Sequence, residues 1–167
     1  GKFRSNQCMI EKNGMAPFVT EKEMYPQVCE WLKRFLRDRY ARSEIYVYDC
    51  SRRSLHKFIQ ETGLISNLAP EWPSWDIQVD IVGFIIDTHA TRLAFVECKN
   101  VPIKLSHLSQ ILGYSRVVLP EYALILSPHG VSTSLKSLLI TYRRTDVLQY
   151  VGSPGRLANS VVVARWD

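Results

Sequence analysis

Three charged side chains lie inside two apolar runs near the middle of the chain. Asp80 is the second residue of the run VDIVGFII, and Glu97 and Lys99 lie at the end of the run LAFVECK. The polar turn between the runs predicts a β-hairpin, with strands at residues 77–86 and 93–99 and a turn at residues 87–92. Burial makes an unpaired charge costly, so these three residues need either partners or a chemical task.

The alternation of side chains along a strand brings the three charges together. Residues two apart share a face, so Glu97 and Lys99 point one way while Val96 and Cys98 point the other. A tight hairpin lets Asp80 approach the first of these faces. Two carboxylates this close repel each other unless a cation lies between them, and a hard divalent ion with oxygen ligands is the usual solution. Mg²⁺ is the expected ion, and Mn²⁺ is expected to substitute for it. A surface salt bridge on a solvated sheet face is the alternative.

Helices and further strands are expected around this hairpin. The capping-box pattern from Thr20 to Glu23 begins a helix that runs to about residue 39, with Pro26 in its second turn. Further helices are predicted at 55–62, closed by Gly63, at 105–118 and at 132–142, and further strands at 45–48, 122–126, 147–151 and 161–164. Residues 1–19 are unassigned, and residues 20–167 are expected to form a single domain.

Length, charge and cysteine content narrow the class of protein. The chain has 167 residues, of which 46% are hydrophobic, and this suits one globular domain. A net charge of +5 favours a polyanionic partner. No apolar run reaches the length of a membrane span, and the four cysteines lack the spacing of a zinc site or a disulfide framework. We expect a cytoplasmic or nucleoid-associated protein.

Asp80 in VDIVGF, followed by Glu97-Cys98-Lys99, resembles the PD-(D/E)XK nuclease superfamily, although Val79 stands where that pattern has proline. The resemblance covers roughly Thr20 to Leu126. The segment QILGY, with Gln110 and Tyr114, is similar to the QxxxY motif of RecB-type and Cas4-type nuclease domains. The four-cysteine iron–sulfur spacing that many of those domains carry is missing here.

The resemblance implies an α/β, restriction-endonuclease-like fold, in which a mixed central sheet is flanked by helices. It implies a metal-dependent nuclease that hydrolyses DNA phosphodiester bonds in restriction, repair or recombination. Asp80, Glu97 and the Cys98 backbone carbonyl would hold Mg²⁺, and Lys99 would orient or deprotonate the attacking water, or stabilise the pentavalent phosphate. Gln110 and Tyr114 share a helix face and would reach the catalytic edge or the DNA backbone.

Such nucleases often carry a glutamate on the first helix, and three residues compete for that position. Helical periodicity places Glu21 on the arc of Met24, Val28 and Leu32, whereas Glu23 and Glu30 lie together on the flank. We therefore expect Glu21 to face the active site and to assist the metal through water.

DNA is the expected partner, and a homodimer or a larger complex is possible. Arg52, Arg53 and Lys57 are candidate phosphate contacts, although such clusters are more often solvated. Trp72 and Trp75 are expected in the core rather than stacked on bases, and the four histidines are expected at the surface. Two alternatives stay open: a catalytically silent nuclease-fold module that binds DNA or a protein, and a role without nucleic acid.

Overall fold

The computed structural model describes residues 3–5, 20–150 and 159–167. Its helices are α1 (Tyr25–Arg39), α2 (Leu55–Thr62), α3 (Leu105–Val118) and the short α4 (Thr133–Lys136), which continues as a π-helical segment, Ser137–Thr141. Short 3₁₀ turns are η1 (Glu21–Met24), η2 (Trp72–Ser74) and η4 (Thr145–Leu148). The strands are β1 (Phe3–Ser5), β2 (Glu44–Asp49), β3 (Ile81–Ile86), β4 (Thr91–Cys98), β5 (Tyr122–Ser127), β6 (Gln149–Tyr150), β7 (Asn159–Ser160) and β8 (Val162–Trp166).

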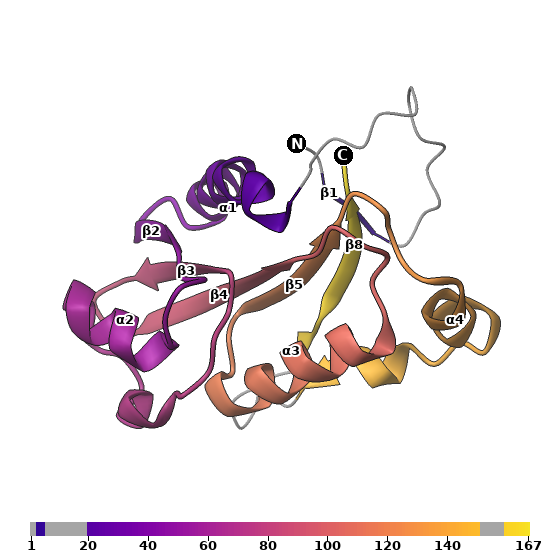
Figure 1. Ribbon diagram of the computed structural model, residues 1–167. Coiled ribbons are helices and arrows are strands. Elements are labelled where there is room, and N and C mark those ends of the chain that lie inside the picture. The colour runs from indigo at the N-terminus through magenta and orange to yellow at the C-terminus, as the bar shows by residue number, and fades with distance from the viewer. Residues whose placement is uncertain (1–2, 6–19, 151–158) are drawn as a thin grey trace.

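Six of these strands form one mixed sheet in the order β1-β8-β5-β4-β3-β2. Strands β2, β3 and β4 form an antiparallel meander, and β4, β5 and β8 run parallel. Figure 1 shows α1 on one face of the sheet and α2, α3 and α4 on the other. The predicted α/β architecture, a mixed sheet flanked by helices, is confirmed at this level.

The core follows from the alternation of side chains on the central strands. Ile81, Val96 and Cys98 face α1, whereas Val82 and Phe95 pack on the opposite side beside α2. A third apolar cluster joins α3 and α4 to β5 and β8. Because β4 is covered on both faces, almost all its residues are buried. Its final residues are therefore held in a rigid frame.

Most predicted elements are confirmed, but the start of the first helix differs. The Thr20 side chain makes no capping hydrogen bond, so the predicted capping box is wrong. The Glu23 N–H instead donates to the Thr20 backbone carbonyl at 3.3 Å, which winds the entry as a 3₁₀ turn. The α-helix begins only at Tyr25, which places Pro26 in its first turn, where proline costs no hydrogen bond.

The C-terminal part of the chain is also less regular than predicted. The helix expected at 132–142 is one α-helical turn followed by a π-helical segment. Of the strand expected at 147–151, the first two residues end the 3₁₀ turn η4, Gln149–Tyr150 form the strand β6, and residue 151 lies outside the described residues. The strand expected at 161–164 is confirmed as β8.

Two further findings concern membranes and thiols. In the described ranges no helix combines the length and the apolar composition that crossing a membrane requires. Cys29, Cys50 and Cys98 are free thiols, and Cys8 lies outside the described residues.

Gly83 allows α1 to lie close to β3, and this close approach can be tested. A β-carbon at Gly83 would lie 2.7 Å from Cδ1 of the buried Leu36. We expect Gly83→Val to lower the free energy of unfolding by about 1–3 kcal/mol through overpacking.

Gly113 lies on the exposed side of α3, where an added β-carbon would meet no neighbouring side chain within 4 Å. Gly113→Ala should stabilise by about 0.5–1 kcal/mol. Urea denaturation of both variants provides the measurement, and equal effects would contradict this account.

Candidate functional site

The candidate site lies where the β3–β4 hairpin opens. The last regular cross-strand pair is Ile81 with Val96, so Asp80 and Glu97 would form the next pair. Like charges placed opposite each other destabilise a sheet. Here the Asp80 backbone N–H donates to Glu97 Oε1 at 3.0 Å, which draws the glutamate toward Asp80 instead of away from it. The hairpin therefore ends in a close pair of carboxylates.

Both oxygens of the Asp80 carboxylate accept hydrogen bonds. The Cys98 backbone N–H donates to Oδ2 at 2.8 Å, and the Tyr25 hydroxyl donates to Oδ1 at 3.0 Å. The Asp80 side chain thus accepts from the Cys98 N–H in place of the backbone carbonyl that a continued β3 strand would supply. Asp80 connects β4 to the start of α1.

The strand predicted at 77–86 begins only at Ile81, because the preceding backbone bonds elsewhere. The carbonyl of Ile77 accepts from the Leu55 N–H at 2.7 Å, and the carbonyl of Asp80 accepts from the Cys50 N–H at 2.8 Å. The Cys50–Asp80 bond continues the register of the β2–β3 pairing by one residue, whereas Leu55 is the first residue of α2, in the insertion between β2 and β3. The chain before Ile81 is therefore held beside the end of β2 and the start of α2, and regular pairing with β4 begins only at Ile81.

Burial makes this carboxylate pair unfavourable when both members are charged. Glu97 is only 7% exposed, and burial together with the nearby Asp80 raises its pKa to about 8, although Lys99 acts in the opposite direction. Burial also raises the pKa of Asp80, against the effect of its hydrogen bonds from Cys98 and Tyr25 and of Lys99. The pair retains one proton near neutral pH unless a cation replaces that proton.

Glu21 is the least exposed of the three glutamates considered for a position near this pair. It is half-buried on η1, whereas Glu23 and Glu30 are exposed. After burial, which is the largest cause, the Glu21 charge adds to the rise in the pKa of Asp80. Its partial burial and its charge effect on Asp80 support the expected inward position, and a role as a metal ligand stays a prediction.

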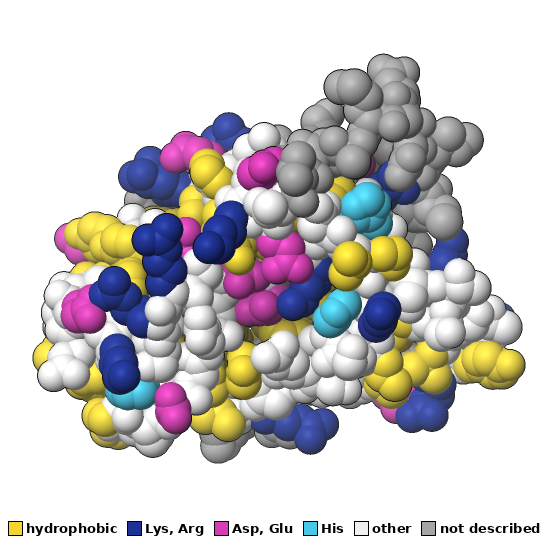
Figure 2. Space-filling view, viewed as in Figure 1, with side chains coloured by type: hydrophobic (Ala, Val, Ile, Leu, Met, Phe, Trp, Pro, Cys, Tyr) yellow, Lys and Arg dark blue, Asp and Glu magenta, His cyan; other side chains and the backbone are white. Residues whose placement is uncertain are grey.

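Lys99 directly follows β4, and its backbone N–H donates to the Leu126 carbonyl at 2.8 Å. Nearby in α3, His107 accepts a hydrogen bond at Nδ1 from the Lys104 backbone N–H at 3.0 Å. Burial and the charges of Lys99 and Lys104 hold the pKa of His107 below its usual value. Figure 2 shows acidic side chains together near the middle of this face, between α1 and α3, with basic and histidine side chains beside them.

Sequence reasoning missed Tyr25 and the position of His107. His107 is expected at the surface, but its ring is half-buried. Tyr25 lies four residues after Glu21, so helical spacing could have placed both on one face. Its partner Asp80, however, lies 55 residues away in the chain.

Gln110 and Tyr114 bond to each other. The Gln110 side-chain amide donates to the Tyr114 hydroxyl at 3.1 Å on the outer part of α3, where Gln110 is exposed. Tyr114 also packs against the apolar cluster beside α2. Among the described residues, no hydrogen bond or ion pair links either side chain to Asp80, Glu97 or Lys99. The shared helix face is confirmed, and a catalytic role stays a prediction.

The candidate phosphate-binding residues lie on the insertion. Arg52, Arg53 and Lys57 are all exposed, and Arg53 forms an ion pair with Glu61. Trp75 is fully buried, as predicted, and the half-buried Trp72 packs on the same cluster. The insertion thus has an apolar core and a basic surface.

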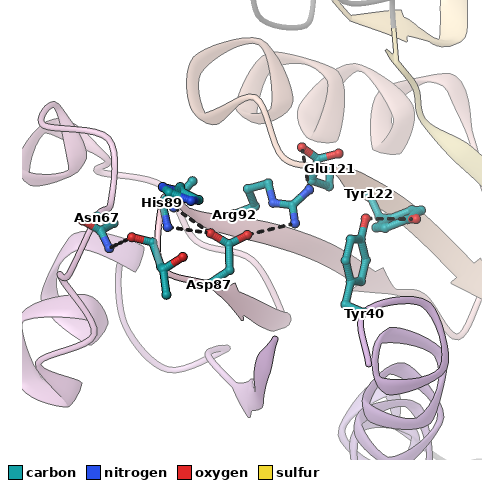
Figure 3. Close-up of polar contacts among 9 residues, drawn as sticks. Tyr40, Asn67, Asp87, His89, Arg92, Glu121 and Tyr122 are labelled. Carbon is teal, nitrogen blue, oxygen red and sulfur yellow. Dashed lines mark hydrogen bonds and ion pairs between the residues drawn. The ribbon is translucent and has the colours of Figure 1, made fainter. Parts of the chain in front are cut away.

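A second polar cluster, at the closed end of the hairpin, has a structural role (Figure 3). Arg92 lies 3.4 Å from Asp87 and 3.8 Å from Glu121, and its guanidinium stacks over the Tyr40 ring at 4.9 Å. Tyr40 in turn bonds to Tyr122. Arg92 lies within ion-pair distance of both carboxylates, and the cluster ties the hairpin turn to α1 and β5.

The donor set at the open end fits a magnesium ion. Asp80 and Glu97 supply carboxylate oxygens at one point, and Mg²⁺ is commonly held by one or two carboxylates, waters and substrate phosphates. Within residues 3–5, 20–150 and 159–167, no three His, Cys, Asp or Glu side chains converge closely enough to bind a metal ion by themselves. The fit therefore suits an ion that shares its ligands with substrate, not a closed structural site.

Comparisons of the chain with protein-family models, with curated proteins and with solved structures find no significant match. The case for a function therefore rests on the chemistry of the site.

The raised pKa of Glu97 predicts a pH-dependent stability without metal. The folded protein keeps this proton up to about pH 8, whereas the unfolded chain releases it near the usual value of 4.5. Folding is thus favoured at low pH, and stability falls as pH rises between these values. Glu97→Gln removes the charge but still accepts from the Asp80 N–H. In EDTA at pH 8.5 it should raise the melting temperature by about 3 °C or more.

At pH 4.5 the same substitution should have little effect on the melting temperature, because the wild-type glutamate is then largely protonated in the folded protein. Glu30→Gln, at an exposed position of α1, controls for the loss of one negative charge. An effect of Glu97→Gln that is equal at both pH values would contradict the assignment of a buried proton.

Proposed function

We propose that the protein is a magnesium-dependent nuclease of the restriction-endonuclease-like type, which hydrolyses DNA phosphodiester bonds. One observation carries the proposal: the half-buried Asp80 and the buried Glu97 form a close carboxylate pair where the β3–β4 hairpin opens, and the charge of Lys99 acts on both. The order of elements supports it, since a helix, a three-stranded meander, a second helix and a parallel strand follow one another around the pair.

In this proposal each residue has a separate task. Asp80 and Glu97, with the Cys98 carbonyl, would hold the divalent cation, and Glu21 would assist through water. When bound, the cation lowers the pKa of a water and neutralises charge that develops on the phosphate. Lys99 donates to a phosphate oxygen or orients the water for in-line attack. The basic surface of the insertion, Arg52, Arg53 and Lys57, contacts the DNA backbone.

In this proposal the Gln110–Tyr114 pair is not part of the catalytic centre. Because the two side chains bond to each other on the outer part of α3, they present a joint polar surface that suits a backbone phosphate. The same bond leaves fewer free donors for the catalytic centre. We therefore assign the pair to DNA contact rather than to the chemical step.

A catalytically silent DNA-binding or protein-binding module is the second candidate. Its support is that both oxygens of Asp80 already accept hydrogen bonds. A buried glutamate next to a second carboxylate costs stability without a metal, however, so a purely binding role leaves Glu97 unexplained. Incubation of plasmid and single-stranded DNA with Mg²⁺, Mn²⁺ or EDTA separates the candidates, and the absence of any metal-dependent cleavage would favour the silent module.

Substitutions at the site should separate metal binding from chemistry. Asp80→Asn and Lys99→Met should each reduce cleavage by about 100-fold or more. Mg²⁺ should raise the melting temperature of wild type and of Lys99→Met, because an ammonium group is not a metal ligand, but not that of Asp80→Asn. Asp38→Asn, at an exposed position of α1, is the control and should retain wild-type activity. Wild-type rates in either site variant would rule out the catalytic assignment.

The basic surface of the insertion should make binding sensitive to salt. With Ca²⁺ in place of Mg²⁺, the variant in which Arg52, Arg53 and Lys57 are all alanine should bind DNA about 10-fold more weakly. Its plot of log K against log salt should be shallower by about 2–3, since each lost phosphate contact removes roughly 0.9. Fluorescence anisotropy between about 50 and 200 mM salt is the measurement.

A charge-matched control shows whether position matters in that experiment. Arg34, Arg37 and Arg42 are exposed on α1 and on the turn that follows it. Their replacement by alanine removes the same total charge from another part of the surface. An equal loss of affinity in both triple variants would mean that net charge alone attracts DNA and that the insertion makes no specific contact.

A further inference from the structure

Tyr25 is the side chain in contact with the carboxylate pair to which the motifs assign no role. It is the first residue of α1, directly after the η1 turn that carries Glu21, and it is 6% exposed. Its hydroxyl donates to Asp80 Oδ1 at 3.0 Å. A buried tyrosine hydroxyl normally finds a partner, but here the partner is the proposed metal ligand.

The hydrogen bonds at Asp80 fix the direction of its carboxylate. The Cys98 N–H holds Oδ2 at 2.8 Å, and the Tyr25 O–H holds Oδ1, so the group cannot rotate without breaking one of them. Burial, and then the neighbouring Asp80 charge, raise the pKa of Tyr25 well above its usual value, so its proton is retained. Each carboxylate oxygen has about two acceptor sites, which leaves one on each oxygen for another ligand.

We infer that Tyr25 is a positioning residue, whose hydroxyl orients Asp80 toward a divalent cation shared with Glu97. This inference rests on the proposed function. A hydrogen-bond donor to a metal-binding side chain orients that side chain toward the metal. The loss of such a donor typically weakens metal binding by about 10–100-fold. Cys98 supplies its donor from the backbone, which substitution cannot remove. Tyr25 supplies the donor that can be removed.

A purely structural role for Tyr25 makes a different prediction. If the hydroxyl only fixed the start of α1 to the sheet, its removal would lower the melting temperature but leave the affinity for metal unchanged. A positioning role changes the metal concentration that the protein needs. Once metal is saturating, Asp80 is held by the ion itself, so the maximal rate should recover.

The test compares Tyr25→Phe with wild type in two measurements. Calorimetric titration with Mn²⁺, without DNA, should show about 10-fold weaker binding to Tyr25→Phe. The Mg²⁺ concentration for half-maximal cleavage should rise by a similar factor, while the rate at saturating Mg²⁺ stays within a few fold of wild type. Tyr40→Phe is the matched control, since it removes another hydrogen-bonded tyrosine hydroxyl, 3.3 Å from that of Tyr122 and outside the site.

The outcomes distinguish this inference from the proposed function. If wild type neither binds Mn²⁺ nor cleaves DNA, both the function and the role of Tyr25 are wrong. If wild type binds Mn²⁺ and Tyr25→Phe binds it equally well, only the role of Tyr25 is wrong. A fall in affinity of the same size in Tyr40→Phe would also overturn it.

A second measurement on wild-type protein covers the case in which Tyr25→Phe does not fold. In tyrosine-labelled protein with assigned NMR signals, Mg²⁺ should shift the ring signals of Tyr25, because the oxygen that accepts its hydrogen bond also becomes a metal ligand. The ring signals of Tyr40 should not move. Saturating Mg²⁺ that leaves the Tyr25 signals unchanged would overturn the inference.

Discussion

The close approach of the half-buried Asp80 and the buried Glu97 is the constraint on which the rest of this structure depends. A charged pair in the interior is stable only when donors or cations surround it. Here the backbone of Asp80 holds Glu97, the backbone of Cys98 and the hydroxyl of Tyr25 hold Asp80, and Lys99 supplies positive charge. These groups come from α1, from the start of β3 and from the end of β4. The position of each element is thus tied to the same few oxygen atoms.

Elements whose boundaries depend on local chemistry could be predicted from sequence. The helix at Leu105–Val118 has the boundaries expected from its apolar spacing, and Leu55–Thr62 ends at Gly63, which adopts the left-handed conformation that favours glycine. In each case the neighbours within one or two helical turns contain the necessary information.

Features that depend on distant partners could not be predicted in this way. Residues 77–80 have the composition of a strand, but the Ile77 carbonyl bonds to Leu55 at the start of α2, and β3 begins only at Ile81. Thr20 has the pattern of a helix cap, yet its backbone closes a tighter turn. The part played by Tyr25 depends on an aspartate in another element. Tertiary contacts override local propensity at these positions, and they lie at or beside the site.

The separation of Tyr25 and Asp80 along the chain has a kinetic consequence. Their hydrogen bond spans 55 residues, so it cannot form until α1 has docked on the meander. Contacts between distant residues are formed late when their closure entropy is large. A hairpin that folds early therefore carries Asp80 and Glu97 without the donor from α1. Such a partly folded chain would have the hydrogen bonds from the Asp80 and Cys98 backbones but not the one from Tyr25, so the full set of donors around the two acids is complete only when α1 has docked.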